Sequence, residues 1–342
     1  MTFKKVKVEE AVGMVLGHEL TKIVPGSYKG PAFHKGHVIT AEDISHLKDI
    51  GKEHIYLIEL TDEQLHENDA AIRIAQAVCG TNVQYSVASE GRVNLIAQVG
   101  GLLKINPEAV AVINAAGHIA VSTKHSNIVV NPGDLLAAAK VVPLVIDKSI
   151  ITEVEQQAKV YGEVIKVLPL ANLKVAAIIT GNEVYYGRIE DKYRQILTEK
   201  VQQYGAGLVE TVYQPDDSEA ITNTILDLKA KGMELIICAG GMSVDPDDVT
   251  PDAIRATGAQ VVTYGSPVLP GAMFMLAYLD DDVPLLGMPA CGMYSKTTVL
   301  DLVLPRILAG EKLIRQDIAN LGYGGLCSNC KVCHYPHCPF GK

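Results

Sequence analysis

The sequence predicts an α/β protein whose main domain has three layers (α/β/α), with a mostly parallel β-sheet between two layers of helices. From residue 173 onward, apolar runs of strand length alternate with amphipathic helical segments, and glycines end most of the helices. Such alternation is typical of a parallel sheet with helices on both faces. The pattern before residue 173 is mixed, which predicts a smaller α+β region at the N-terminus.

The chain is expected to contain several domains, because 342 residues exceed what one ordinary core accommodates. We expect a small α+β region at 1–65, a mixed, β-rich domain at 66–170, the three-layer domain at 171–312 and a cysteine-rich tail at 313–342. In the first two segments the pattern predicts a helix over 42–50 that ends at Gly51, a strand over 54–60 and a helix over 69–79 that ends at Gly80.

The elements of the main domain follow in order along the chain. The predicted strands lie at 173–180, 207–214, 234–239, 260–264 and 283–288, and the predicted helices lie at 191–204, 216–231, 250–257 and 293–309, the last one interrupted or bent at Pro305.

The stretch "GGMSVDPDDVTPDAI", Gly240 to Ile254, links a strand to a helix. Thr250 is expected to cap the helix and Pro251 to be its first residue. The two glycines permit a positive φ or a close approach of the backbone. The aspartates that follow have two interpretations: a turn closed by a capping aspartate, or carboxylates that hold Mg²⁺ beside a phosphate.

Four loops are expected at one edge of the sheet, because ligands bind at the carboxyl ends of parallel strands. These loops are Thr180–Gly187, Gln214–Ser218, Gly240–Thr250 and Gly287–Ser295. Each one carries glycine, small hydroxyl or acidic residues. Together they could form a pocket with backbone donors for phosphates and with carboxylates for a metal or for proton transfer.

These loops resemble those of the molybdopterin-binding domain shared by molybdopterin adenylyltransferases and molybdopterin molybdenumtransferases. "TGNEV" is similar to the transferase loop T-G-D-E-L, "QPDDSEAI" to its P-D-E/D loop and "GGMSV" to G-G-V-S-V. "DDVTPDAI" resembles the adenylyltransferase motif R-D-V-T-P-E/D-A, and "GMPACGMYS" lies where the transferase has G-L-P-G-N-P-V-S. The order and spacing match over roughly 140 residues, from about 173 to 310.

The resemblance implies a cofactor, a reaction and a set of residues. The ligand would be molybdopterin or its adenylylated form with Mg²⁺, and the reaction would insert molybdate with release of AMP. By position, Glu183, Asp216 and Asp248 would be the catalytic acids. The residues that would bind the pterin or its phosphate are Thr180, Gly181, Gly240, Gly241, Ser243 and Pro289.

The sequence departs from the family pattern at several of these positions. Asn182 replaces the family aspartate, and Asp247 replaces the arginine that precedes D-V-T-P. Binding tolerates such changes more readily than catalysis, so the alternative is a non-catalytic carrier, chaperone or sensor of the molybdenum cofactor. In either case we expect a homo-oligomer, with molybdoenzymes or other cofactor-biosynthesis proteins as partners.

The C-terminal tail holds four of the seven cysteines: Cys327, Cys330, Cys333 and Cys338. Their spacing, C-x2-C-x2-C-x4-C-P, is that of a bacterial ferredoxin run with one extra residue before the last cysteine. The tail therefore predicts a thiolate site for an iron–sulfur cluster or for Zn²⁺, with His334 and His337 as alternative ligands. A tail of free reactive cysteines is the third interpretation.

The composition excludes other classes of function. A formal net charge of −9 argues against a surface that binds nucleic acid by neutralising phosphates. Neither a secretory signal nor an apolar run of about 20 residues is visible, so we expect a soluble, cytoplasmic protein that does not enter a membrane.

Overall fold

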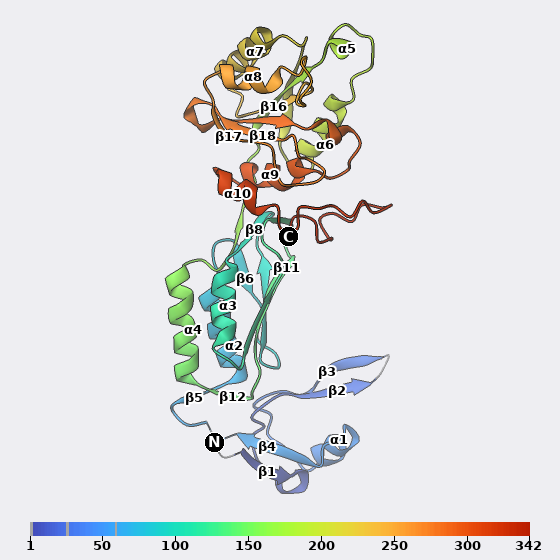
Figure 1. The fold of residues 1–342 in the computed structure, drawn as a ribbon. Coiled ribbons are helices and arrows are strands. Elements are labelled where there is room, and N and C mark those ends of the chain that lie inside the picture. Colours follow the sequence, from blue (N-terminus) through green and yellow to red (C-terminus); the bar gives the residue numbers. More distant parts are fainter. Residues whose placement is uncertain (1–2, 25–26, 59) are drawn as a thin grey trace. The chain divides into compact units, whose positions relative to one another are not determined.

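The computed structural model of the chain describes residues 3–24, 27–58 and 60–342. The chain forms two compact units that interleave in sequence (Figure 1). The first contains residues 1–99, 105–124 and 132–166, and the second contains residues 100–104, 125–131 and 167–342. The four-segment division expected from the sequence stays a prediction. In the described part of the chain, every helix is too short or too polar to cross a membrane.

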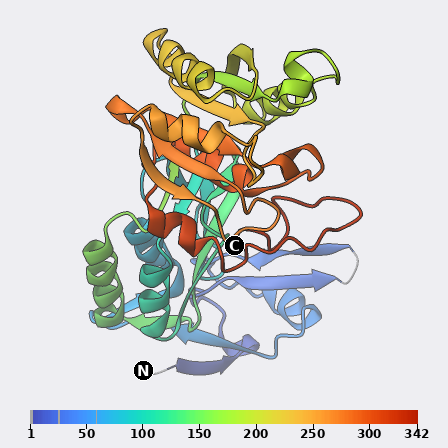
Figure 2. The same cartoon turned by 45° about the horizontal axis from the view of Figure 1, so that its top comes forward.

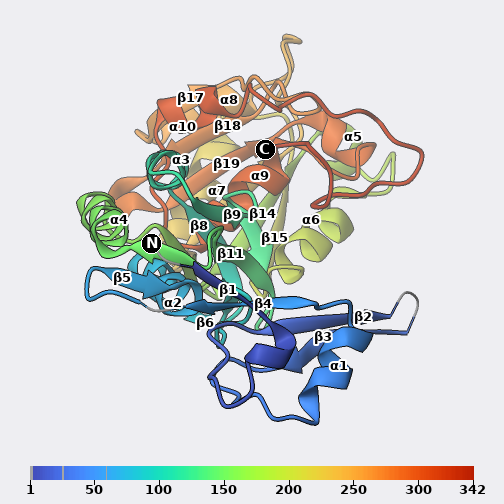
Figure 3. The ribbon, with the colours of Figure 1, turned by 90° about the horizontal axis from the view of Figure 1, so that it is seen from below.

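The N-terminal part of the first unit contains two antiparallel strand pairs and one helix (Figure 3). Strand β1 (Phe3–Lys7) pairs with β4 (His54–Ile58), and β2 (Leu20–Val24) pairs with β3 (Tyr28–Phe33). The helix α1 (Asp43–Asp49) and the short 3₁₀ helix η1 (Val8–Glu10) bury Leu47 and Val8 in a small core. The strand expected over 54–60 is observed as β4, and its residue Glu59 lies outside the described residues.

The rest of the first unit is a four-stranded antiparallel sheet with three helices on one side (Figure 1). The strand order is β6 (Val83–Tyr85), β7 (Arg92–Ala97), β11 (Leu135–Val141), β9 (Ile119–Thr123). The helices are α2 (Glu67–Val78), α3 (Pro107–Ala115) and α4 (Lys148–Tyr161). Two short strands, β5 (Gln64–His66) and β12 (Val145–Asp147), pair beside them. A further sheet, whose residues belong mostly to the second unit, has the order β10 (Ile128–Val130), β8 (Gly101–Ile105), β13 (Ile165–Leu168).

The second unit is built on a six-stranded sheet of order β15-β14-β16-β19-β18-β17. Its strands are β14 (Lys174–Thr180), β15 (Gly207–Gln214), β16 (Leu235–Ala239), β17 (Gln260–Tyr264), β18 (Met275–Tyr278) and β19 (Pro284–Met288). The pairs among β15, β14, β16 and β19 are parallel, and β18 and β17 are antiparallel additions at the other edge. The mostly parallel sheet is therefore confirmed. The sequence did not separate β18 from the apolar residues around it.

Helices cover both faces of this sheet, which confirms the three-layer α/β/α class (Figure 1). Successive residues of β14 point to opposite faces. Ala177 and Ile179 pack with α6 (Tyr193–Gln202) and α9 (Val299–Leu308), whereas Ala176 and Ile178 pack with α7 (Ser218–Ala230) and α8 (Thr250–Ala256). The shorter helices are α5 (Asn182–Tyr185), α10 (Arg315–Asn320), η2 (Asp280–Asp282) and η3 (Ala290–Met293).

The last long helix starts later than the sequence predicts. The expected helix began at residue 293, but α9 begins at Val299, because Thr298 and Asp301 form a capping box in front of it. The helix continues through Pro305 to Leu308. The loop at 294–297 is thereby left outside the helix.

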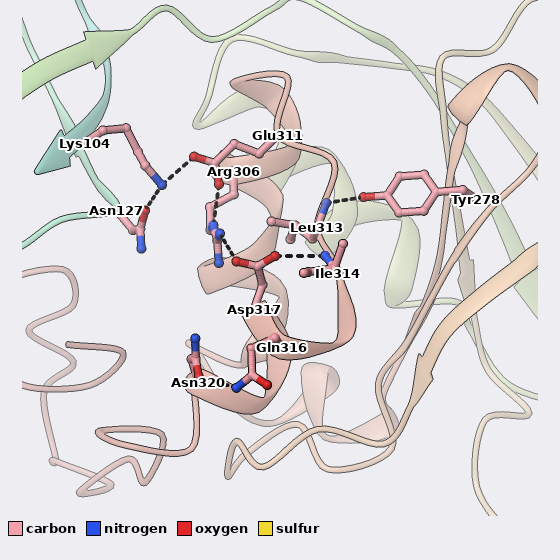
Figure 4. A network of polar contacts seen from close by, with 10 residues as sticks. All are labelled: Lys104, Asn127, Tyr278, Arg306, Glu311, Leu313, Ile314, Gln316, Asp317 and Asn320. Atoms are coloured by element: carbon pink, nitrogen blue, oxygen red, sulfur yellow. Dashed lines mark hydrogen bonds and ion pairs between the residues drawn. The ribbon is translucent and has the colours of Figure 1, made fainter. Parts of the chain in front are cut away.

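A buried arginine fixes the chain that follows α9 (Figure 4). The Arg306 guanidinium donates to Glu311 at 2.7 Å and to Asp317 at 2.9 Å. Glu311 in turn pairs with Lys104 at 2.5 Å. Because Asp317 also accepts the Ile314 backbone N–H, this network fixes the start of α10.

Candidate functional site

A cleft of about 1060 Å³ lies at the carboxyl ends of the parallel strands of the second unit. Its lining comes from the loops that follow β14, β15, β16 and β19, as the sequence predicts. The predicted residues that line it are Thr180, Gly181, Glu183, Asp216, Gly240, Gly241, Ser243 and Asp248. Pro289 is not among the lining residues, although its neighbour Ala290 is.

Asn182 and Asp216 join the first two loops through reciprocal hydrogen bonds. The Asn182 backbone N–H donates to the Asp216 carboxylate at 2.9 Å. The Asp216 backbone N–H donates to the Asn182 side-chain oxygen at 3.4 Å. The residue at position 182 therefore helps to fix the carboxylate of Asp216 at the cleft.

The two glycines after β16 are required by close packing between loops. Gly240 has a φ of 106°, and a Cβ built there would lie 2.1 Å from the Thr180 carbonyl oxygen. Gly241 has a φ of 55°, and its Cβ would lie 2.8 Å from the Thr250 hydroxyl. A side chain at either position would collide with a neighbouring segment of the chain, so packing alone requires both glycines, whether or not they also leave room for a ligand.

The prediction that Thr250 caps α8 is wrong. Thr250 is the first residue of the helix and is 0% exposed. Its hydroxyl donates to the Gly240 carbonyl oxygen at 2.9 Å and lies 3.1 Å from the Thr180 hydroxyl. Thr250 therefore lies one position too late to cap the helix, and its hydroxyl ties α8 to the glycine loop instead.

The three aspartates of this loop have different roles. The Asp248 carboxylate accepts the Asp245 backbone N–H at 3.1 Å, so it closes the turn. The Asp245 and Asp247 side chains are exposed at the rim of the cleft. The turn interpretation therefore accounts for one aspartate and leaves two carboxylates without a structural role in the loop.

The acids of the cleft interact electrostatically. Partial burial raises the pKa of the Asp216 carboxyl, while the hydrogen bond from the Asn182 backbone lowers it. The negative charges of Glu183, Asp248 and Asp247 raise this pKa further, and the net shift is upward. The three predicted acids therefore line one cleft, in which Asp216 and Asp248 are half-buried and Glu183 is exposed.

The sequence analysis missed the cations of the cleft, Arg188 and Lys192. They lie just beyond the predicted loop Thr180–Gly187, and their closeness to that loop is the one signal in the sequence that points to them. The lining holds seven carboxylates against these two cationic side chains, so the cleft is strongly negative. No group of three or more histidine, cysteine, aspartate or glutamate side chains in the described ranges is arranged to hold a metal ion.

The four tail cysteines line a second, smaller cavity of about 300 Å³. Cys330 and Cys333 are exposed, and Cys327 and Cys338 are partly buried against the core. A hydrogen bond with the Thr297 hydroxyl lowers the pKa of the Cys333 thiol. Tyr294 lines both this cavity and the larger cleft, so the loop after η3 separates the two.

Comparison with known proteins finds a family match within the second unit. Residues 176–309 match the family described as the probable molybdopterin binding domain. This segment is a domain of that family. Residues 5–59 match a domain of unknown function, DUF8806. The molybdopterin-binding match includes all the predicted acids and glycines of the cleft.

The individual relatives match only part of this chain, at 30% sequence identity or less. CinA-like proteins of Citrifermentans bemidjiense and of Geobacter sp. strain M21 are each 30% identical over 90 residues, which is 26% of this chain. The chain spans only 22% of the length of these curated relatives. Among solved structures, the molybdopterin biosynthesis enzyme MoaB of Thermus thermophilus is 17% identical, with a TM-score of 0.33, and the match covers 41% of this chain and 98% of that one. The protein CinA of Thermoplasma acidophilum is 13% identical, with a TM-score of 0.34, over 40% of this chain and 99% of that one.

Proposed function

We propose that the molybdopterin-binding domain binds molybdopterin, or its adenylylated form, in the cleft at the carboxyl edge of its sheet during synthesis of the molybdenum cofactor. The observation that carries the proposal is the convergence of the loops after four parallel strands on one cleft, with the half-buried Asp216 among them. The family match over the same residues supports it. Ligands of open α/β sheets bind at this edge.

The charge of the cleft supports Mg²⁺ as part of the ligand. A phosphate is an anion, and seven carboxylates against two cations would repel it. Mg²⁺ is usually held by one or two carboxylates together with substrate phosphates and water, rather than by a complete protein cage. We therefore propose that Mg²⁺ enters with the phosphate and that Asp216 is its main protein ligand, with Asp248 or Glu183 in support.

Other lining residues suit the rest of the ligand. Arg188 and Lys192 can pair with phosphate oxygens that Mg²⁺ does not cover. Tyr294 is 84% exposed and lines the cleft, so its ring is free to stack on a pterin. Tyr186 does not line the cleft, and the Arg188 guanidinium lies over its ring.

For the reaction, we propose the insertion of molybdate into adenylylated molybdopterin with release of AMP. Glu183, Asp216 and Asp248 would bind the metal and take the proton of the water that attacks the phosphoanhydride, so that one phosphate stays on the pterin and the other leaves in AMP. The test is anaerobic incubation of the full chain with adenylylated molybdopterin, molybdate and Mg²⁺, with AMP as the readout. Asp248→Asn keeps an oxygen that can accept the Asp245 N–H, and we expect it to release AMP at least about 100-fold more slowly. Asp227→Asn, an exposed acid on α7, is the matched control and should release AMP at the wild-type rate.

A non-catalytic carrier of the cofactor is the second candidate. It is favoured by Asn182, which supplies an amide where the family has an acid and whose amide oxygen accepts the Asp216 backbone N–H. Wild-type protein that binds the pterin but releases no AMP at any molybdate or Mg²⁺ concentration would establish the carrier and reject the transferase.

A further inference from the structure

The C-terminal tail is fastened to the second unit at several points by contacts that need no metal. At its start, the Leu269 backbone N–H donates to the Gly325 carbonyl and the Cys327 N–H donates to the Leu269 carbonyl, both at 2.8 Å. At its end, the Gly341 N–H donates to the Gly324 carbonyl at 2.9 Å. The two ends of the segment 324–341 therefore meet, and the cysteines lie on a loop that the fold has already closed (Figure 2).

Aromatic side chains anchor the middle of this loop to the domain. The Tyr335 hydroxyl donates to the Asp301 carbonyl at 3.0 Å. Phe340 is buried in the core of the domain and packs edge-on against the Tyr335 ring. Burial of large aromatic surfaces stabilises this arrangement. The conformational entropy of closing the loop is thus lost on folding, and a ligand of the loop does not have to supply it.

All four cysteines line the cavity that this loop encloses. Cys327 and Cys338 rest against the core, and Cys330 and Cys333 lie on the exposed stretch between the anchors. All four are free thiols, although closely spaced cysteines are suited to disulfides. The described lining contains no carboxylate, but it does contain Lys296 and Lys331. Such a site suits soft thiolate-bound metals, and the two ammonium groups would offset part of the thiolate charge.

We propose that Cys327, Cys330, Cys333 and Cys338 together ligate an iron–sulfur cluster of the [4Fe–4S] type in this cavity. The site is separate from the pterin cleft and does not depend on the proposed function.

The dimensions favour a cluster over a single ion. A zinc ion draws four sulfur atoms to about 2.3 Å from one point. The cavity that the four cysteines line has a volume of about 300 Å³, which leaves room for more than one ion among the sulfur atoms. A cluster brings its own iron and sulfide atoms to fill such a space. The spacing C-x2-C-x2-C with a later Cys-Pro is also that of ferredoxin ligands.

Little of the protein has to move when the cluster binds. The two core-facing cysteines are already held by the domain, so only the exposed stretch between Ser328 and His334 must adjust. A hydrogen bond between the Thr297 hydroxyl and the Cys333 thiol, at 3.2 Å, already holds one exposed thiol to the cavity wall.

The first test measures iron and acid-labile sulfide in the full chain after anaerobic purification or reconstitution with ferrous iron and sulfide. We expect about four of each per chain, with a broad visible absorption that bleaches on reduction. Cys330→Ser should lose most of the iron and colour. Cys79→Ser removes a cysteine outside the tail and should keep both; the circular dichroism of the two variants should match that of the wild type. A colourless protein with one zinc per chain would overturn the iron–sulfur assignment.

The second test follows alkylation of each cysteine by mass spectrometry, and it reports on the site without any enzymatic activity. In the metal-free chain Cys330 and Cys333 should react first, because they are the exposed pair. In the loaded chain all four should be protected and should become reactive together when a chelator or air removes the iron. A chain that takes up no metal, and whose thiols react in the order of their exposure under every condition, would reject the site.

Discussion

Replacement of Gly240 by alanine distinguishes the two explanations of the glycine loop. The new Cβ would lie 2.1 Å from the Thr180 carbonyl oxygen, whereas real Cβ atoms stay at least 3.0 Å from such a neighbour. The backbone of β14 or of the loop must therefore move by about 1 Å, which costs about 1–3 kcal/mol as overpacking. The positive φ of Gly240 adds about 1–2 kcal/mol for a residue with a side chain. We expect Gly240→Ala to destabilise the domain by about 3 kcal/mol.

Gly232→Ala is the matched control, because Gly232 also has a positive φ, 81°, but its Cβ would meet nothing within 4 Å. This variant should lose only the cost of the positive φ, about 1–2 kcal/mol. Hydrogen exchange of the β14 and β16 amides in the full chain measures both effects, and the difference of about 2 kcal/mol corresponds to roughly 30-fold faster exchange in Gly240→Ala. If the two variants exchange at the same rate and Gly240→Ala loses only pterin binding, the glycine serves the ligand and the packing argument fails.

Two further predictions concern buried charge. The Lys200 ammonium lies 2.6 Å from the Asp301 carboxylate, and both side chains are buried. Lys200→Met leaves this carboxylate without its cation, so the free energy of unfolding should fall by about 3–5 kcal/mol. Lys231→Met removes an exposed pair with Glu210 and should change the free energy of unfolding by less than about 1 kcal/mol. Equal effects in denaturant titrations would show that the buried pair is not structural. Burial raises the pKa of the Asp216 carboxyl in the folded state above its pKa in the unfolded state. The folded state therefore holds the carboxyl proton more tightly. The contribution of Asp216 to stability falls as the pH rises from the unfolded-state pKa through the folded-state pKa. Asp216→Asn should therefore make the ligand-free protein more stable than the wild type at neutral pH, with the difference shrinking as the pH is lowered; a variant that is less stable at neutral pH would contradict the shift.

The sequence was sufficient for the parts of the fold that depend on local pattern. The apolar run 234–239 and the glycines after it predict β16 and its loop, because strand length and turn chemistry agree there. Met275–Tyr278 was missed, because one apolar run gives no sign of where an antiparallel strand begins. The first unit could not be ordered, since residues 100–104 and 125–131 leave it for the second unit, and such long-range exchanges leave no periodic signal.

The site shows the same division between local and tertiary information. The acids and glycines of the cleft could be located, because each follows a strand and the edge rule brings strand ends together. The role of Thr250 could not be predicted, because its hydroxyl donates a hydrogen bond to the Gly240 carbonyl. This contact joins residues ten positions apart, and only the folded loop creates it. Arg188 and Lys192 were missed for a similar reason, since their loop had to be folded before they faced the carboxylates.

The most direct test of the proposed function is an anaerobic equilibrium titration of molybdopterin into the full chain, with and without Mg²⁺. The proposal predicts binding that requires Mg²⁺, that weakens at least about 10-fold in Asp216→Asn and that is unchanged in Asp227→Asn. Asparagine keeps an oxygen that can accept the Asn182 N–H, so the loop should remain in place and only the charge should be lost. Equal affinity without Mg²⁺, or in Asp216→Asn, would contradict a metal-bridged phosphate in this cleft.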